Sequence, residues 1–184
     1  MKDPLIKGHP VHAILSDLPV GTTTAAVACD LMGMATGRRE WYFATQATLG
    51  LAVLSGSSAA LVGLWDYLAV PHEHPARRVG AVHGFVNAGV LSLLALSFTA
   101  RQRRARAKAG PSVFAHATTL GALMALGVSG WLGGEMVFRL GWRVTPAEHA
   151  EQLEEDLRQH GEEARIAKAH DAVQSYEEEH ALLP

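Results

Sequence analysis

The sequence predicts an all-α integral membrane protein: a four-helix transmembrane bundle followed by an acidic helical tail outside the membrane. Three segments lack Asp, Glu, Lys and Arg, and each is long enough to cross about 30 Å of hydrocarbon. Charge separates the two parts. From Thr145 onward eleven acidic side chains accompany three basic ones, whereas the chain before it carries thirteen basic and seven acidic residues. We therefore expect a bundle over residues 1–143 and a tail over residues 144–184.

Four spans are predicted, over about residues 11–36, 41–69, 79–100 and 113–138. The last three contain the charge-free segments 41–65, 79–100 and 113–134, where a soluble helix would show a charged stripe. The first span is interrupted by Asp17 and Asp30. We count it as a span because a helix buried among three others can carry polar groups that face inward.

The tail begins with a helix-start pattern, Thr145-Pro146-Ala147-Glu148, and continues in residues that favour helix and carry charge. We expect one or two helices outside the membrane. Four histidines recur every ten or eleven residues, too far apart to share one ion, so a solvated helix face is the favoured interpretation. They are His149, His160, His170 and His180.

Basic residues in the loops predict the orientation. The connection between the third and fourth spans and the one between the first and second spans lie on one side of a four-span chain. These two connections hold Arg101, Arg103, Arg104, Arg106 and Lys108, and Arg38 and Arg39. Positive loops are typically cytoplasmic. We therefore expect a multi-pass protein of the plasma membrane with both termini outside.

Several function classes find no support in the sequence. Cys29 is the only cysteine, which excludes a disulfide framework and a CxxC pair. The basic run is explained by topology, so no nucleic-acid partner is expected. Phosphate-binding loops and the nucleophile elbow of hydrolases are missing from the sequence. The lipid bilayer is the expected partner, and homo-oligomerisation is left open.

Ionisable residues gather near the predicted outer end of every span. They are His9, His12 and Asp17 at the first, Asp66 with His72 and His74 at the second, His83 and Asn87 at the third, and Glu135 and Arg139 at the fourth. Near the cytoplasmic ends, by contrast, only Asp30 and His116 are found. Placing charges in a membrane costs up to about 2.5–3.5 kcal/mol each at a helix centre. The shared level therefore suggests that the outer groups face one another.

The functional hypothesis is a membrane redox, metal or haem module with a site near the outer face. We expect His12, His83, Asp66, Glu135 and His9 as ligands, supported by Asp17, Asn87, Arg139, His72 and His74. Imidazole with carboxylate suits Zn, Cu or Fe, and His83 with His12 or His9 suits a b-type haem. Two alternatives stay open: a non-catalytic scaffold or partner-docking subunit, whose polar groups only pair and whose tail docks a partner, and a proton or ion pathway. The pathway is disfavoured by the lack of polar residues across the middle of the spans.

Four motifs occur in order: His9-Pro10-Val11-His12 leading to Asp17, Gly63-Leu64-Trp65-Asp66, His83-Gly84-Phe85-Val86-Asn87, and Gly133-Gly134-Glu135. Over about residues 9–141 they resemble a family of uncharacterised bacterial four-helix membrane proteins known only as a domain of unknown function. Some members are joined to Rieske-type iron–sulfur domains, which implies redox work and an outer redox partner. This chain has Asp17 where a third His is usual, Ala13 where a Pro is usual and Glu135 in place of an apolar residue. If that third His is a ligand in relatives, this chain binds a different ion or none.

Overall fold

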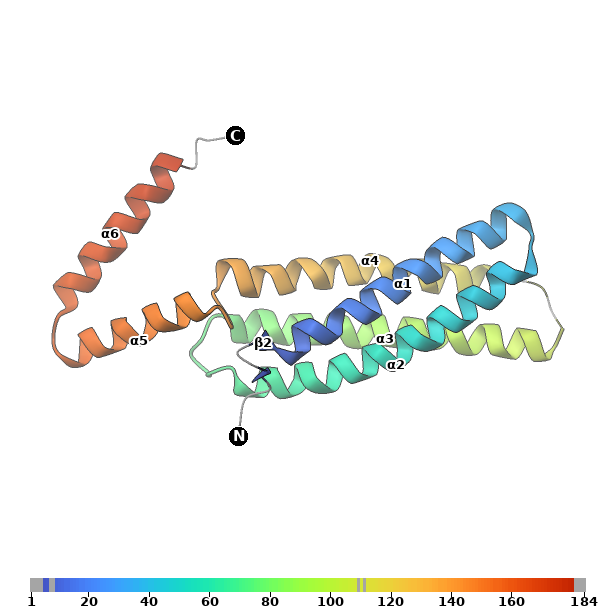
Figure 1. Ribbon diagram of the computed structural model, residues 1–184, viewed down its shortest axis with the longest axis horizontal. Helices are drawn as coiled ribbons and strands as arrows, with labels where there is room; N and C mark the ends of the chain where they lie inside the picture. Colours follow the sequence, from blue (N-terminus) through green and yellow to red (C-terminus); the bar gives the residue numbers. More distant parts are fainter. Residues whose placement is uncertain (1–4, 7–8, 109, 111, 181–184) are drawn as a thin grey trace. The chain divides into compact units, whose positions relative to one another are not determined.

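The computed structural model describes residues 5–6, 9–108, 110 and 112–180, and these form two compact units divided between Leu140 and Gly141 (Figure 1). The first unit contains four long helices and a short hairpin, and the second contains two helices. In chain order the elements are β1 (Leu5–Ile6), β2 (His9–Pro10), α1 (Val11–Thr36), α2 (Arg39–Ala69), α3 (Ala76–Arg106), α4 (Val113–Gly134), the π-helical turn η1 (Glu135–Arg139), α5 (Thr145–Gln159) and α6 (Glu163–His180).

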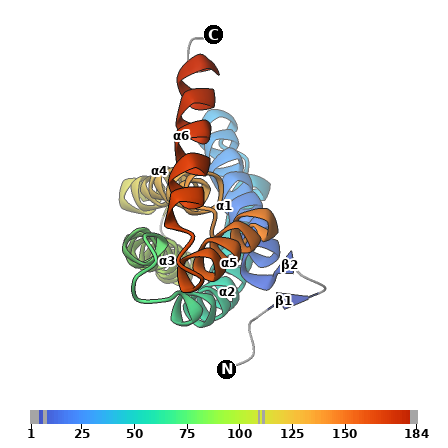
Figure 2. The same cartoon turned by 90° about the vertical axis from the view of Figure 1, so that its left-hand side faces the viewer.

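The four long helices pack side by side, each antiparallel to the next. α1 lies against α2, α2 against α3, α3 against α4, and α4 returns to α1, so the helices enclose a common interior (Figures 1 and 2). The α1–α2 connection is short because Gly37 adopts φ 66°, which glycine tolerates, and its N–H bonds to the Gly33 carbonyl at 2.9 Å. Up-and-down packing places every second connection at the same end of the bundle.

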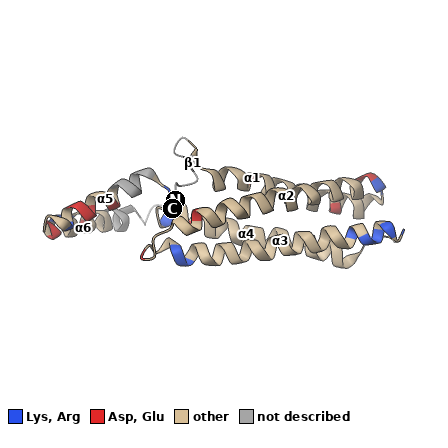
Figure 3. Ribbon diagram, turned by 90° about the horizontal axis from the view of Figure 1, so that it is seen from below, with Lys and Arg blue, Asp and Glu red and all other residues tan. Residues whose placement is uncertain are grey.

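The two ends of the bundle differ in charge. We call the end that holds the α1–α2 and α3–α4 connections the basic end, because Arg38, Arg39, Arg101, Arg103, Arg104, Arg106 and Lys108 lie there (Figure 3). We call the opposite end, where α1 and α3 begin and α2 and η1 finish, the histidine end. The basic loop residues noted in the sequence therefore lie together at one end of the bundle axis.

The interior is built from small and aliphatic side chains. Ala26, Leu49, Ala52, Leu94 and Ala122 form a core with exposures of 1% or less, and Val90 joins them. Large apolar side chains instead cover the outside of the bundle, where they would contact lipid in a membrane. Among the most exposed in the bundle are Leu54, Leu61, Phe43, Phe85, Val113 and Phe138. This distribution is the one expected of helices that pack in hydrocarbon.

Three of the helical segments are long and apolar enough to cross a membrane: Arg39–Ala69, Ala76–Arg106 and Val113–Arg139. α1 does not meet the same criterion of composition, although it completes the bundle. Asp17, Asp30 and a run of threonines lower its hydropathy. The structure therefore supports an all-α membrane protein with three candidate spans.

The tail unit is a pair of helices. α5 begins at Thr145, where the helix-start pattern lies, although the side chains of 145–149 are outside the described part of the chain. Gly161, at φ 72°, allows the turn between α5 and α6. Ile166 is the tail's buried apolar residue at 7% exposure, and His170 Nε2 lies 2.8 Å from the Glu154 carboxylate. His160 lies near Asp156, so these two described histidines each have an acidic neighbour.

Candidate histidine site

Two of the predicted ligands lie next to each other at the histidine end. His12 is in the first turn of α1 and His83 lies two turns into α3, and both are partly buried. Their ring centroids are 6.0 Å apart and their planes are nearly perpendicular, at 86°. α1 and α3 both begin at this end, so residues 71 positions apart in sequence reach the same level of the bundle.

His12 is held by α2. Its Nδ1 lies 2.9 Å from the Ala59 carbonyl oxygen, and because a carbonyl only accepts, this nitrogen carries the hydrogen. The ring fits because residue 63, one turn further along α2, is glycine. A Cβ at Gly63 would lie 2.7 Å from both Cε1 and Nδ1 of His12, closer than real contacts allow. The bonded Nδ1 leaves Nε2 of the neutral imidazole with a free lone pair.

His83 is held by a polar triangle between α3 and α4. Its Nδ1 donates to the Ser129 carbonyl at 3.0 Å, and its Nε2 accepts from the Asn87 amide at 2.9 Å. The Ser129 hydroxyl in turn donates to Asn87 Oδ1 at 2.9 Å. The i, i+4 spacing of His83 and Asn87 predicted their shared face. Ser129 was missed, because one serine among many hydroxyl residues in the spans carries no distinguishing signal.

In the described part of the chain, the carboxylates do not complete a metal-ligand cluster with the two histidines. Asp66 is buried, with 9% exposure, and makes its own interactions. Glu135 accepts from Arg139 Nη1 at 2.7 Å, an i, i+4 pair in which the arginine side chain is 77% exposed. Among the residues that the structure describes, no three His, Cys, Asp or Glu side chains are placed to hold a metal ion. The expected convergence of four ligands is therefore reduced to a pair of histidines.

The remaining predicted residues lie outside this pair. His9 is exposed on β2, Asp17 is exposed on α1, and His72 is exposed in the α2–α3 connection. His74 has a local structural role, because its Nδ1 accepts from the Ala76 N–H at 3.1 Å where α3 begins. Within the described part of the chain, no hydrogen bond or ion pair links His9, Asp17 or His72 to the His12–His83 pair.

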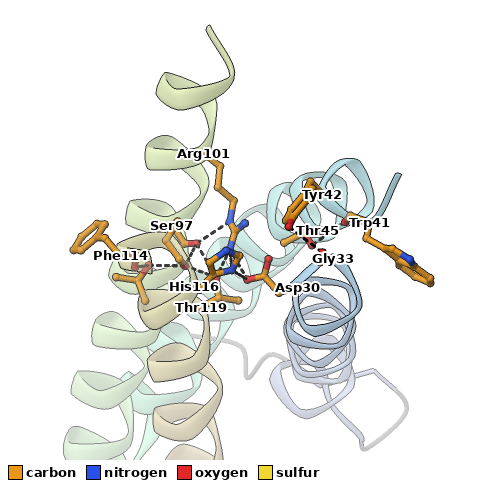
Figure 4. Close-up of polar contacts among 12 residues, drawn as sticks. Asp30, Gly33, Trp41, Tyr42, Thr45, Ser97, Arg101, Phe114, His116 and Thr119 are labelled. Carbon is orange, nitrogen blue, oxygen red and sulfur yellow. Dashed lines mark hydrogen bonds and ion pairs between the residues drawn. The ribbon is translucent and has the colours of Figure 1, made fainter. Parts of the chain in front are cut away.

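A second polar cluster lies inside the basic end (Figure 4). Asp30 of α1 accepts a hydrogen bond from Arg101 of α3, and His116 Nδ1 of α4 lies 2.9 Å from the same carboxylate oxygen. The three side chains are 5%, 11% and 15% exposed, respectively. One carboxylate oxygen thus joins three helices. The sequence placed Asp30 and His116 near this end but nothing in it paired them with Arg101.

Hydroxyl groups complete the surroundings of Arg101. Its Nε lies 3.3 Å from Ser97 Oγ and its Nη2 lies 3.3 Å from Thr119 Oγ1, and the two hydroxyl oxygens are 2.7 Å apart. The second Asp30 oxygen, Oδ1, is buried and finds no hydrogen-bond partner in the described part of the chain. The cluster is therefore a buried ion pair in which one acceptor, Asp30 Oδ1, has no hydrogen-bond partner among the described residues.

The fold and these two clusters define a helical membrane protein with polar groups buried at both ends of its bundle. Residues 8–146 match the family described as a predicted membrane protein, DUF2231, and the chain belongs to that family. The resemblance seen in the sequence is thereby confirmed, and the acidic tail lies beyond the matched region. No curated protein and no solved structure matches the chain. The association with Rieske-type domains stays a prediction.

Proposed function

We propose that this protein is a membrane-embedded redox or metal-binding module that holds a transition-metal ion or a b-type haem between His12 and His83. One observation supports this most directly. The two imidazoles come from different helices, α1 and α3. The Nδ1 of His12 bonds to a backbone carbonyl of α2, and the Nδ1 of His83 bonds to a backbone carbonyl of α4. Metal-bound histidines almost always anchor their other nitrogen in this way, because the bond sets the tautomer and the ring orientation.

The distance between the rings is also suitable. Zn–nitrogen bonds are about 2.0–2.1 Å long, so two nitrogens on opposite sides of one ion lie about 4 Å apart. Each ring centroid lies further from the ion than its own nitrogen, so the centroid separation exceeds this value. The observed centroid separation is 6.0 Å. Zn, Cu and Fe are the ions that imidazole suits, and a haem bound this way would supply one-electron transfer. The outer redox partner expected from the resemblance would then exchange electrons at this end.

His83 can act as a ligand only if the hydrogen bond from the Asn87 amide to its Nε2 is broken. Its amide now donates to His83 Nε2, the same lone pair that a metal would use. His12 has no such competitor in the described part of the chain, since its hydrogen bond is made through Nδ1. Binding would therefore begin at His12 and finish when the Asn87 amide turns away from His83.

The test is the absorption spectrum and metal content of the purified full-length protein, produced with iron and haem precursors supplied. We expect a Soret band or a stoichiometric ion in the parent, and at least a tenfold loss of cofactor in both His12→Ala and His83→Ala. His160→Ala, in the tail, is the matched control and should retain it. A parent protein without cofactor, or full retention in both ring variants, would refute the proposal.

The second candidate function is a non-catalytic membrane scaffold. A specific observation favours it: the His83–Asn87–Ser129 triangle satisfies both ring nitrogens, and Glu135 is already paired with Arg139. In this case His83→Ala lowers the stability of the bundle and leaves the spectrum and metal content unchanged. The acidic tail would then serve to dock a protein partner.

The proposal includes four crossings of the plasma membrane with both termini outside. α1 contributes 26 helical residues, about 39 Å at about 1.5 Å per residue, and it packs along α2 and α4. The basic end supports a cytoplasmic location for the α1–α2 and α3–α4 connections. Reporter fusions provide the test. Activity of a periplasmic reporter after Pro184, and of a cytoplasmic reporter within residues 101–108, is expected, and the reverse result would invert the orientation.

A further inference from the structure

We propose that the basic end of the bundle is a binding surface for anionic phospholipids, whose phosphate head groups it holds through Arg103, Arg106 and Lys108 with help from Arg39. This inference is independent of the histidine site. It rests on which cations at this end are neutralised by the protein itself, on their depth relative to the apolar span, and on the contrast with the opposite end.

Few of the cations at the basic end have an acidic partner. The carboxylates that the structure describes there are Asp30 and Glu40. Asp30 is used inside the bundle by Arg101 and His116, and Glu40 lies 3.5 Å from Arg38 Nε. The cations that no described carboxylate neutralises are Arg39, Arg103, Arg104, Arg106 and Lys108. All five are exposed, so this end carries a positive charge that the protein leaves for an external anion.

The depth of these residues matches the lipid phosphates. α3 has a charge-free segment over residues 79–100, which at about 1.5 Å per residue is about 33 Å, close to the thickness of the hydrocarbon layer. Residues after Ala100 therefore emerge at the head groups. The first of them, Arg101, turns inward to Asp30 (Figure 4). The following cations are exposed and lie on the last turns of α3 and in the connection after it, where Figure 3 shows the ribbon in blue.

Two of the three arginines that the structure describes at the histidine end of the bundle are engaged differently, and the third, Arg78, is exposed. Arg77 donates to the Val70 carbonyl at 2.5 Å and its guanidinium lies 4.8 Å from the centre of the Tyr67 ring. Arg139 is paired with Glu135. Asp17, Asp66 and Glu73 add negative charge at the same end. The described bundle therefore has its surplus of positive charge at one end only, and the surface there distinguishes anionic from zwitterionic lipids.

Arginine suits this ligand. Its planar guanidinium can donate two parallel hydrogen bonds to one phosphate, and Arg103 and Arg106, three residues apart, share one side of α3. Arg104 is partly committed, because its Nε donates to the Gly110 carbonyl at 2.6 Å. Each Lys or Arg close to an anionic membrane surface raises the binding constant for that surface by about fivefold at ordinary salt. Three free cations are therefore enough for a measurable lipid preference.

The experiment measures lipid association by the purified full-length protein in phosphatidylcholine vesicles that contain spin-labelled phosphatidylglycerol or spin-labelled phosphatidylcholine. The readout is the ratio of the two association constants. We expect the parent to favour phosphatidylglycerol by about fivefold or more at low salt, with the ratio falling as salt rises. In the triple variant Arg103→Gln, Arg106→Gln, Lys108→Gln the ratio should fall by about twofold or more, with Arg39 and Arg104 left in place.

The matched control removes the same three residue types from the tail, in Arg158→Gln, Arg165→Gln, Lys168→Gln, and should keep the parent ratio. Helix content by circular dichroism verifies that both triple variants are folded. A parent ratio near one, or a ratio that survives in the basic-end variant, would overturn the proposal. Loss of the preference when inorganic phosphate replaces chloride at equal ionic strength would assign the surface to a soluble phosphate instead.

Discussion

Removing the Asp30 carboxylate should destabilise the bundle more than any other single loss of charge. In Asp30→Leu, Arg101 keeps a guanidinium whose side chain is only 11% exposed, and His116 loses its acceptor at 2.9 Å. An uncompensated charge is then left between α1, α3 and α4. Leucine is chosen because it preserves most of the volume and adds no new hydrogen-bonding group.

The magnitude follows from the burial of the pair. Removing one partner of a buried ion pair costs about 3–5 kcal/mol. We expect about 3 kcal/mol, the lower limit, because Arg101 lies near the head groups and can extend its guanidinium toward them. Replacing both partners, in Asp30→Leu with Arg101→Leu, removes the buried charge altogether and should cost no more than about 1 kcal/mol. The two single variants are therefore strongly non-additive.

The assay is unfolding of the detergent-solubilised protein by sodium dodecyl sulfate, followed by far-ultraviolet circular dichroism. A double-mutant cycle gives the coupling energy between Asp30 and Arg101. The Glu135–Arg139 pair supplies an internal comparison, since its arginine is 77% exposed and its coupling should be about 0.5 kcal/mol or less. Equal coupling in the two pairs, or additive effects of Asp30→Leu and Arg101→Leu, would refute the argument from burial.

Two further predictions concern packing and the tail. Gly63→Ala places a methyl group 2.7 Å from the His12 ring, so it should displace the ring from the Ala59 carbonyl and cost about 1–3 kcal/mol in the same assay, whereas Gly84→Ala meets nothing within 4 Å and should change stability by no more than about 1 kcal/mol. Equal effects of the two would show that His12 is not held as described. Truncation after Gly141 should leave a compact, helical bundle with its unfolding midpoint unchanged, because the tail forms a separate unit. Its aggregation would show that the tail stabilises the bundle.

The sequence by itself was enough to predict the helical class and the positions of the long helices. Each prediction depended on a local property: a run of about twenty residues without charge needs no partner to make it helical in hydrocarbon, where every backbone group must bond within its own segment. The spacing of His83 and Asn87 on one helix is local in the same sense, and the structure places them in contact. The charges of the loops could likewise be identified from the sequence without knowing how the helices pack.

Only the tertiary structure decided which polar groups meet. Contacts such as His12 with Ala59, His83 with Ser129 and Asp30 with Arg101 depend on how each helix is rotated about its axis and how closely its neighbours approach. The sequence placed ionisable groups at one level, yet in the structure Glu135 pairs with Arg139 and the rings of His12 and His83 lie next to each other. The depth of a residue depends only on its position along its helix, so the shared level of the ionisable groups was predictable. Which side chains face each other depends on how all four helices pack together, so their pairing was not predictable.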